Sequence, residues 1–94
     1  MTLTIIASVI VKEEFLQDTK LRMLDLVEQS KQEKGCLKYT LHQDNKNSDT
    51  FLFIENWQSK TLWEKHLESL HVQSFVKETE NSIVEFSVQE MSQI

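Results

Sequence analysis

The 94-residue sequence contains no proline, a single glycine and a single cysteine. One glycine is too few for the glycine-rich loops that bind phosphates, and neither a flavin nor a nicotinamide fingerprint is present. One cysteine cannot form a disulfide within the chain, which favours a reducing, cytoplasmic setting. These absences exclude phosphate-binding loops and the common nucleotide-cofactor motifs.

The sequence also lacks a run of basic residues, and its net charge is −5, from 15 acidic and 10 basic side chains. An acidic surface repels nucleic acid and anionic membranes, so neither is expected as a partner. The apolar segment 3–11 is too short to span a bilayer, and no basic segment precedes it. We therefore interpret this segment as a strand.

The residues that are present describe an ordinary globular chain, with 39% hydrophobic and 27% charged side chains. The length predicts one domain, residues 1–94. A chain this short buries only about 60–65% of its unfolded surface, so a monomer is expected to be modestly stable and dimerisation would help.

Hydrophobic periodicity predicts the element order β-α-β-β-α-β. Strands are expected at 2–11, 36–43, 50–57 and 83–91, and the first helix at 13–33, with a polar hairpin connection at 44–49. This order is that of the ferredoxin-like split βαβ arrangement, an α+β fold with an antiparallel four-stranded sheet.

The first predicted helix has one apolar arc, formed by Phe15, Leu16, Thr19, Met23, Leu26, Val27 and Ser30. Gly35 is expected to end this helix in the left-handed conformation, where a residue without a Cβ is favoured.

The second predicted helix begins after Ser59, which is a suitable N-cap. Its apolar stripe consists of Leu62, Trp63, His66, Leu67 and Leu70. A further helical stretch is expected after it, with four side chains pointing to the core: Val72, Phe75, Val76 and Thr79.

Two of the strands are apolar on both faces. In strand 50–57, Phe51 and Phe53 alternate with Leu52 and Ile54. Helices can cover only one face of the sheet, and a small domain does not leave the other exposed. A second copy packed sheet to sheet would bury it, so we expect a homodimer.

His66 is the most informative polar residue because it lies in the middle of an apolar stripe. Its imidazole must point into the core or into a cavity, where it needs a hydrogen-bond partner. Two interpretations follow. His66 is either a core histidine bonded to a backbone carbonyl or to Glu55, or a base or substrate anchor that lines a cavity.

Three further polar or amphipathic residues follow one another at the end of strand 50–57. Glu55 and Trp57 share one face, and Asn56 points to the other. Glu55 could pair with a lysine, Trp57 could cap the core and Asn56 could begin the turn into the helix. Alternatively, they join His66 in a site.

His71 follows His66 by five residues, which is about 140° around an unbroken helix. The two histidines therefore share a face only if the helix breaks near Leu70. This spacing is weak evidence for a metal, because zinc ligands on a helix are usually four residues apart or closer. No metal site is expected.

Two segments resemble the antibiotic biosynthesis monooxygenase domain family: EKGCLKYTLHQD (33–44) and FLFIENWQSKTLWEKHLESLHVQSF (51–75). The order of elements matches over essentially the whole chain. The positions that carry the resemblance are Glu33, Gly35, Cys36, Tyr39, Glu55, Trp57, His66 and His71.

The resemblance implies a dimeric α/β barrel-type assembly and cofactor-independent oxygenation of a quinol or related aromatic by O₂. In this chemistry the substrate, deprotonated to an electron-rich anion, reduces O₂ itself, and the protein supplies a dry pocket, a base and donors to the developing oxyanion. The resemblance implies as catalytic residues His66, His71 and Asn56, and as substrate-binding residues Trp57, Glu55, Tyr39 and Trp63.

The sequence departs from other branches of the family. The haem-degrading branch has a histidine where Val76 aligns and an asparagine where Ala7 and Ser8 stand, so no haem is expected. The branch that processes a phosphorylated furanone has a histidine where Val27 aligns. The segment VKEEF replaces the family's Pro-Gly turn after the first strand. The alternatives to an oxygenase are a non-catalytic module that binds or senses a small molecule, and isomerase-type processing of a small carbonyl compound.

Overall fold

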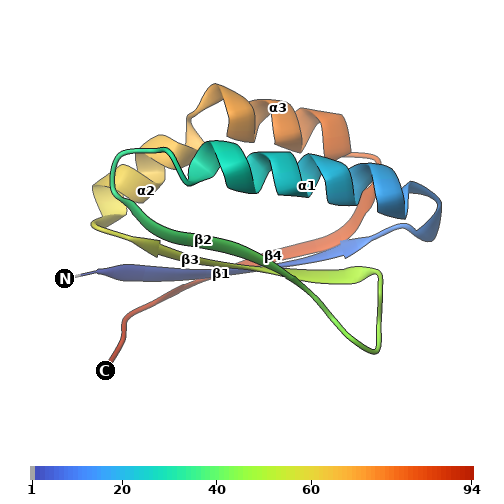
Figure 1. The fold of residues 1–94 in the computed structure, drawn as a ribbon, viewed down its shortest axis with the longest axis horizontal. Helices are drawn as coiled ribbons and strands as arrows, with labels where there is room; N and C mark the ends of the chain where they lie inside the picture. The colour runs from blue at the N-terminus through green and yellow to red at the C-terminus, as the bar shows by residue number, and fades with distance from the viewer. Residues whose placement is uncertain (1) are drawn as a thin grey trace.

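The computed structural model describes residues 2–94 and follows the predicted order of elements (Figure 1). The strands are β1 (Leu3–Val11), β2 (Cys36–Gln43), β3 (Thr50–Trp57) and β4 (Ile83–Met91). The helices are a 3-10 turn η1 (Glu13–Phe15), α1 (Leu16–Ser30), α2 (Lys60–Leu67) and α3 (Leu70–Thr79). The predicted strands are thus confirmed to within one residue.

The four strands form one antiparallel sheet in the order β2-β3-β1-β4, and the helices cover one of its faces (Figure 1). The two strands that flank β1 are β3 and β4, and neither directly follows β1 in the sequence, which is the split βαβ topology. The ferredoxin-like fold is confirmed, with the second helix divided into α2 and α3.

The core lies between the sheet and the helices. On β1, Ile5, Val9 and Val11 face the helices and are at most 1% exposed. From the helix side, α1 buries Thr19, Met23, Leu26, Val27 and Ser30, as its apolar arc predicts. Phe15 precedes α1 and is 40% exposed, so it lies outside this core.

The first helix is shorter than predicted. It ends at Ser30 with Lys31 as its C-cap, and not at residue 33. Gly35 does adopt a positive φ of 87°, but in the turn that leads into β2 and not as the cap of α1. Its carbonyl accepts a hydrogen bond from the Gln58 backbone at 2.8 Å. Glu33 consequently lies in a turn, which frees its side chain from the helix surface.

Replacing Gly35 with alanine is expected to destabilise the fold by about 1–3 kcal/mol. An added Cβ would lie 2.4 Å from Leu62 Cδ1 and 2.9 Å from Leu62 Cβ, in a backbone conformation that side chains disfavour. Urea unfolding measures the loss, and Lys34→Ala at the exposed neighbouring position is the matched control, expected to stay within about 0.5 kcal/mol of wild type. Equal stability of the two variants would show that α2 does not press on this turn.

The second predicted helix breaks earlier than its apolar stripe suggested. Ser69 caps α3 by accepting from Val72 N at 3.4 Å, while its hydroxyl donates to the His66 carbonyl at 2.6 Å. Leu70, predicted to face inward, is therefore 86% exposed. Val76 is 57% exposed, whereas Val72, Phe75 and Thr79 are buried as predicted. Ser59 is confirmed as the N-cap of α2, accepting from Leu62 N at 3.2 Å.

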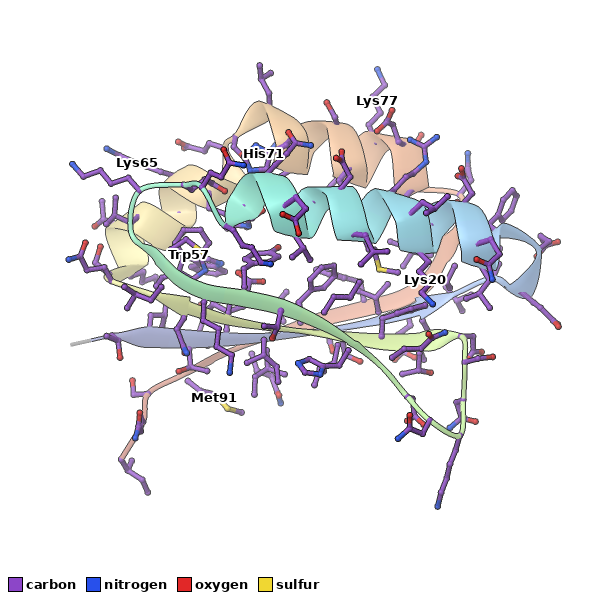
Figure 2. All side chains as sticks on the ribbon, in the orientation of Figure 1. Lys20, Trp57, Lys65, His71, Lys77 and Met91 are labelled. Atoms are coloured by element: carbon purple, nitrogen blue, oxygen red, sulfur yellow. The ribbon has the colours of Figure 1, made fainter. Side chains whose placement is uncertain are left out.

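The sheet face away from the helices has both apolar and polar side chains. The strand register places on it Ile6, Ile10, Leu52, Ile54 and Met91, together with Thr4, Thr40, His42 and Asn56. Figure 2 shows Met91 on this side of the sheet. None of the four leucine and isoleucine side chains here is fully buried within the single chain. Among residues 2–94, no helix is long and apolar enough to cross a membrane.

Candidate functional site

A cavity of about 580 Å³ lies between the sheet and the helices. Its wall is mainly apolar, with side chains such as Phe53, Trp63 and Phe75. The exposed members of the wall belong mainly to α3 and β4, namely Val76, Val84, Phe86 and Val88. The cavity therefore opens between α3 and β4, and its closed end lies toward β2 and α2.

Three polar side chains reach this cavity from its inner wall: Tyr39, Glu55 and His66. Each is at most 4% exposed. Tyr39 and Glu55 are cross-strand partners on β2 and β3, and His66 is on α2 above them. The fold therefore brings three of the residues named from the sequence into one apolar pocket.

His66 is held by one hydrogen bond and by two aromatic rings. Its Nδ1 lies 2.5 Å from Glu33 Oε2. Its ring centroid is 4.7 Å from that of Trp57 and 5.4 Å from that of Tyr39. Within residues 2–94, Nε2 of His66 makes no hydrogen bond, so it is the nitrogen available to a molecule in the cavity.

The partner of His66 is thus Glu33, and neither a backbone carbonyl nor Glu55 as the sequence suggested. Glu33 was not proposed as a site residue because it was assigned to a helix. The available signal was Gly35, since a glycine required at positive φ marks a turn whose neighbours can point away from the helix axis.

His71 contacts the same carboxylate oxygen, with Nε2 2.8 Å from Glu33 Oε2. The break between α2 and α3 makes this possible, because an unbroken helix would separate the two histidines. In Figure 2, His71 lies where α2 meets α3, over the C-terminal end of α1. It does not line the main cavity, and instead borders a shallow groove between α1 and α3.

Glu55 and Trp57 form a buried pair on β3. The Trp57 indole, between the sheet and helix layers in Figure 2, donates to Glu55 Oε1 at 2.9 Å. Burial, reinforced by the charge of Glu33, raises the pKa of Glu55 to about 7, although the Trp57 bond opposes this. Trp57 is itself fully buried and contacts both side chains, Glu55 through its indole N–H and His66 through its ring.

The protonation states of the other two cavity groups follow from burial. Burial, followed by the charge of Glu55, raises the pKa of Tyr39, so its hydroxyl stays protonated as a hydrogen-bond donor. Burial lowers the pKa of His66, against the opposing effect of Glu33. The imidazole is therefore neutral near pH 7 and able to accept a proton.

Asn56, Trp63 and Cys36 occupy different places. Asn56 Oδ1 accepts a hydrogen bond from the Thr4 hydroxyl at 2.9 Å, on the sheet face away from the helices and from the cavity. Trp63 lines the cavity and is 8% exposed. Burial raises the pKa of the Cys36 thiol to about 11, so little reactive thiolate exists at neutral pH.

Glu55→Gln is expected to gain stability relative to wild type as pH rises. The folded-state pKa of Glu55 is raised from 4.5 to about 7. Burial of this side chain therefore does not lower the free energy of unfolding below pH 4.5, where the carboxyl is protonated in both states, and lowers it by the full amount above pH 7. That shift corresponds to about 3 kcal/mol, at 1.36 kcal/mol for each pKa unit.

Urea unfolding of both proteins between pH 4.5 and pH 8, in the presence of EDTA, measures this effect. Ionisable groups that do not interact with Glu55 are shared and cancel in the difference. A difference that stays constant over this range would contradict the raised pKa of Glu55.

The family model for antibiotic biosynthesis monooxygenase matches residues 2–78. The chain belongs to this family. PA3566 from Pseudomonas aeruginosa has a similar solved structure, with 28% identity and a TM-score of 0.95 over 99% of this chain and 94% of that one. A crystal structure named antibiotic biosynthesis monooxygenase has 28% identity and a TM-score of 0.93 over 98% of each chain.

Among curated proteins similar to this chain, YcnE of Bacillus subtilis is 32% identical over 65 residues, which cover 69% of this chain and 64% of YcnE. The protein sll1783 of Synechocystis is 28% identical over 68 residues, covering 72% of this chain and 44% of that protein. The chain thus spans less than two thirds of the length of either relative. The family membership confirms the resemblance identified from the sequence.

Proposed function

We propose that this chain is a cofactor-independent monooxygenase that oxidises a quinol or related electron-rich aromatic in the cavity between the sheet and the helices. The observation that carries the proposal is His66: a buried, neutral imidazole with Nδ1 held by Glu33 and Nε2 available in an apolar cavity. The cavity volume, about 580 Å³, lies within the usual range for small-molecule sites. A reducing, cytoplasmic setting, inferred from the single cysteine, suits a substrate that must arrive as the reduced quinol.

The proposed reaction consumes one quinol and one O₂ and yields one hydroxyquinone and one water. His66 Nε2 takes the phenolic proton, and the resulting anion transfers an electron to O₂. Recombination of the two radicals forms a carbon–oxygen bond and a hydroperoxide. Loss of the ring proton at that carbon then breaks the oxygen–oxygen bond, and the departing hydroxide leaves as water after protonation. The four electrons that O₂ accepts all come from the substrate, so no external reductant is needed.

The remaining polar groups suit this sequence of steps. Tyr39 stays protonated and faces the cavity, so it can donate a hydrogen bond to the developing oxyanion. Glu33 accepts a hydrogen bond from His66 Nδ1–H, which leaves the lone pair on Nε2. The carboxylate also stabilises the imidazolium that forms when Nε2 takes a proton. At the closed end of the cavity, where Tyr39 and His66 are at most 3% exposed, the apolar wall limits the access of water to the reactive intermediates.

Oxygen uptake with a panel of hydroquinones, in the presence of EDTA, tests the proposal. The expected result is one O₂ consumed per quinol, no accumulation of hydrogen peroxide, and ¹⁸O from labelled O₂ in the hydroxyquinone. Wild-type protein that accelerates uptake on none of the panel above the spontaneous rate would contradict it.

A non-catalytic binding module is the second candidate, and one comparison favours it. The N-terminal EF-hand calcium-binding protein 1 of Mus musculus is 28% identical over 65 residues, which cover 69% of this chain but only 18% of that protein. A related segment therefore occurs within a longer protein whose name refers to calcium binding and not to oxidation. Ligand-dependent shifts in the melting temperature, without product detectable by mass spectrometry, would favour this candidate over the enzyme.

We also propose that the chain forms a homodimer through the sheet face away from the helices. Ile6, Ile10, Leu52 and Ile54 form a partly exposed apolar surface on two adjacent central strands. A twofold axis would pair this surface with its own copy, and the family resemblance supports a barrel-type assembly of two sheets.

A further inference from the structure

We propose that Glu33, His66 and His71 form a binding site for a divalent transition-metal ion of the Zn²⁺ type. The site lies behind the inner wall of the cavity. The inference stands on ligand geometry and does not depend on the proposed oxygenation.

The spacing of the three ligand atoms carries the inference. Glu33 Oε2, His66 Nδ1 and His71 Nε2 all lie within 4.8 Å of one another. Both ring nitrogens approach the same carboxylate oxygen, at 2.5 Å and 2.8 Å. Ligands about 2.0–2.2 Å from a tetrahedral zinc ion are roughly 3.3 Å apart, so Glu33 Oε2 would have to move away from both nitrogens by less than about 1 Å to admit the ion. Two histidines and a carboxylate, with a fourth position open, form a ligand set that zinc commonly takes.

The three ligands come from separate elements, and each has its own support. Glu33 is in the turn that Gly35 allows, where its carbonyl accepts from Cys36 N at 3.1 Å. The ring of His66 packs on Trp57. The Ser69 cap sets the start of α3 and thereby the position of His71. The fold therefore already holds these ligands in place, so metal binding loses little further conformational entropy.

The charges around the entrance favour a cation. The Glu33 and His71 side chains are 18% and 17% exposed, so the ligand atoms can be reached from the surface. The groove between α1 and α3 leads to His71 and is lined by the acidic side chains of Asp18, Asp25 and Glu78. Arg22 is the only basic side chain among the groove residues, and it is paired with Asp18 at 3.0 Å and Glu78 at 3.1 Å.

Metal binding would change the chemistry of His66. Coordination through Nδ1 uses the lone pair on that nitrogen, so the ring proton moves to Nε2. The metal-bound protein would then present a hydrogen-bond donor to the cavity, whereas the metal-free protein presents an acceptor there. The same three residues would thus serve either as a hydrogen-bonded cluster or as a metal site.

Cobalt(II) titration of the untagged, EDTA-treated chain tests the site, because four-coordinate Co²⁺ absorbs visible light far more strongly than the hydrated ion. We expect a single equivalent per chain to produce this absorption and Zn²⁺ to abolish it by displacement. Zn²⁺ should also raise the melting temperature, and EDTA should reverse the rise.

The variants His71→Gln and Glu33→Gln separate this site from non-specific binding. Each is expected to weaken Co²⁺ binding by more than about 10-fold, the loss that even an outer-shell partner produces. The matched control is Glu64→Gln, because Glu64 is exposed on α2, away from the cluster and from the proposed dimer surface, and the substitution should leave binding unchanged. Circular dichroism confirms that each variant is folded.

Three outcomes would overturn the inference. They are the absence of cobalt absorption in the wild type, absorption that survives both His71→Gln and Glu33→Gln, and equal weakening by Glu64→Gln. None of them bears on oxygen uptake, which is measured without metal. A failure here is therefore distinct from a failure of the proposed oxygenase.

Discussion

His66→Gln is expected to lower the rate of substrate-dependent oxygen uptake by about 10²–10⁴-fold, the usual contribution of a general base. Glutamine keeps a polar side chain of similar reach but cannot accept a proton near neutral pH. The substrate would then reach its anionic form only through water, which has little access to the buried end of the cavity around His66. Steady-state kinetics with the best hydroquinone measure the effect, which should appear in kcat more than in KM.

Glu64→Gln is the control for this experiment. It introduces the same residue, glutamine, at an exposed position of α2, outside the cavity and the proposed dimer surface. Its oxygen uptake should equal that of the wild type. All assays contain EDTA, so a metal-bound fraction cannot account for a difference. An active wild type and a His66→Gln variant within about twofold of each other would remove His66 from the chemistry.

Leu52→Asp is expected to convert a dimer to monomers and to destabilise the fold by about 3 kcal/mol or more. Leu52 is opposite Ser8 on β1, at the centre of the apolar surface that the helices leave uncovered. In the proposed dimer a carboxylate at this position would be buried against the apolar surface of the partner chain without a partner of opposite charge. Ile54→Asp, two residues along on the same face, should act in the same way.

Sedimentation equilibrium at micromolar concentration measures the assembly. The wild type should sediment as two chains of 11.1 kDa each, and Leu52→Asp as one. Leu70→Asp is the control, because Leu70 is 86% exposed in the helix layer and should not affect association. A wild-type mass of a single 11.1 kDa chain would contradict the dimer directly.

The strands were predictable because each has a local pattern that a buried face requires. In β3, Phe51, Phe53 and Glu55 point to the helices, and the residues between them point away. A shift of one residue would exchange these faces, so the register follows from the pattern. The same alternation predicted that Glu55 and Trp57 share one face of the strand and that Asn56 points to the other face.

The helix ends were less predictable because apolar periodicity does not record where a helix stops. The stripe through Leu67 and Leu70 suggested that the second helix continues to Leu70, yet the Ser69 side chain bonds to the backbone and begins a new helix there. The first helix was likewise predicted to continue to residue 33, beyond the last member of its apolar arc, whereas α1 ends at Ser30. In both cases a hydrogen bond or a turn, and not a hydrophobic contact, determined the boundary.

The sequence by itself determined the fold class, the family and the side chains that share each face of a strand, because these follow from periodicity and from side-chain type. Only the tertiary structure decided how the polar residues are connected. Glu33 meets His66 and His71 across 33 and 38 positions of the chain, through two helix ends that local pattern does not encode. Asn56, adjacent in sequence to Glu55, is separated from the cavity by the thickness of the sheet. Side-chain alternation separates neighbours and chain folding joins distant residues, so the composition of a site can be read locally while its connections depend on the whole fold.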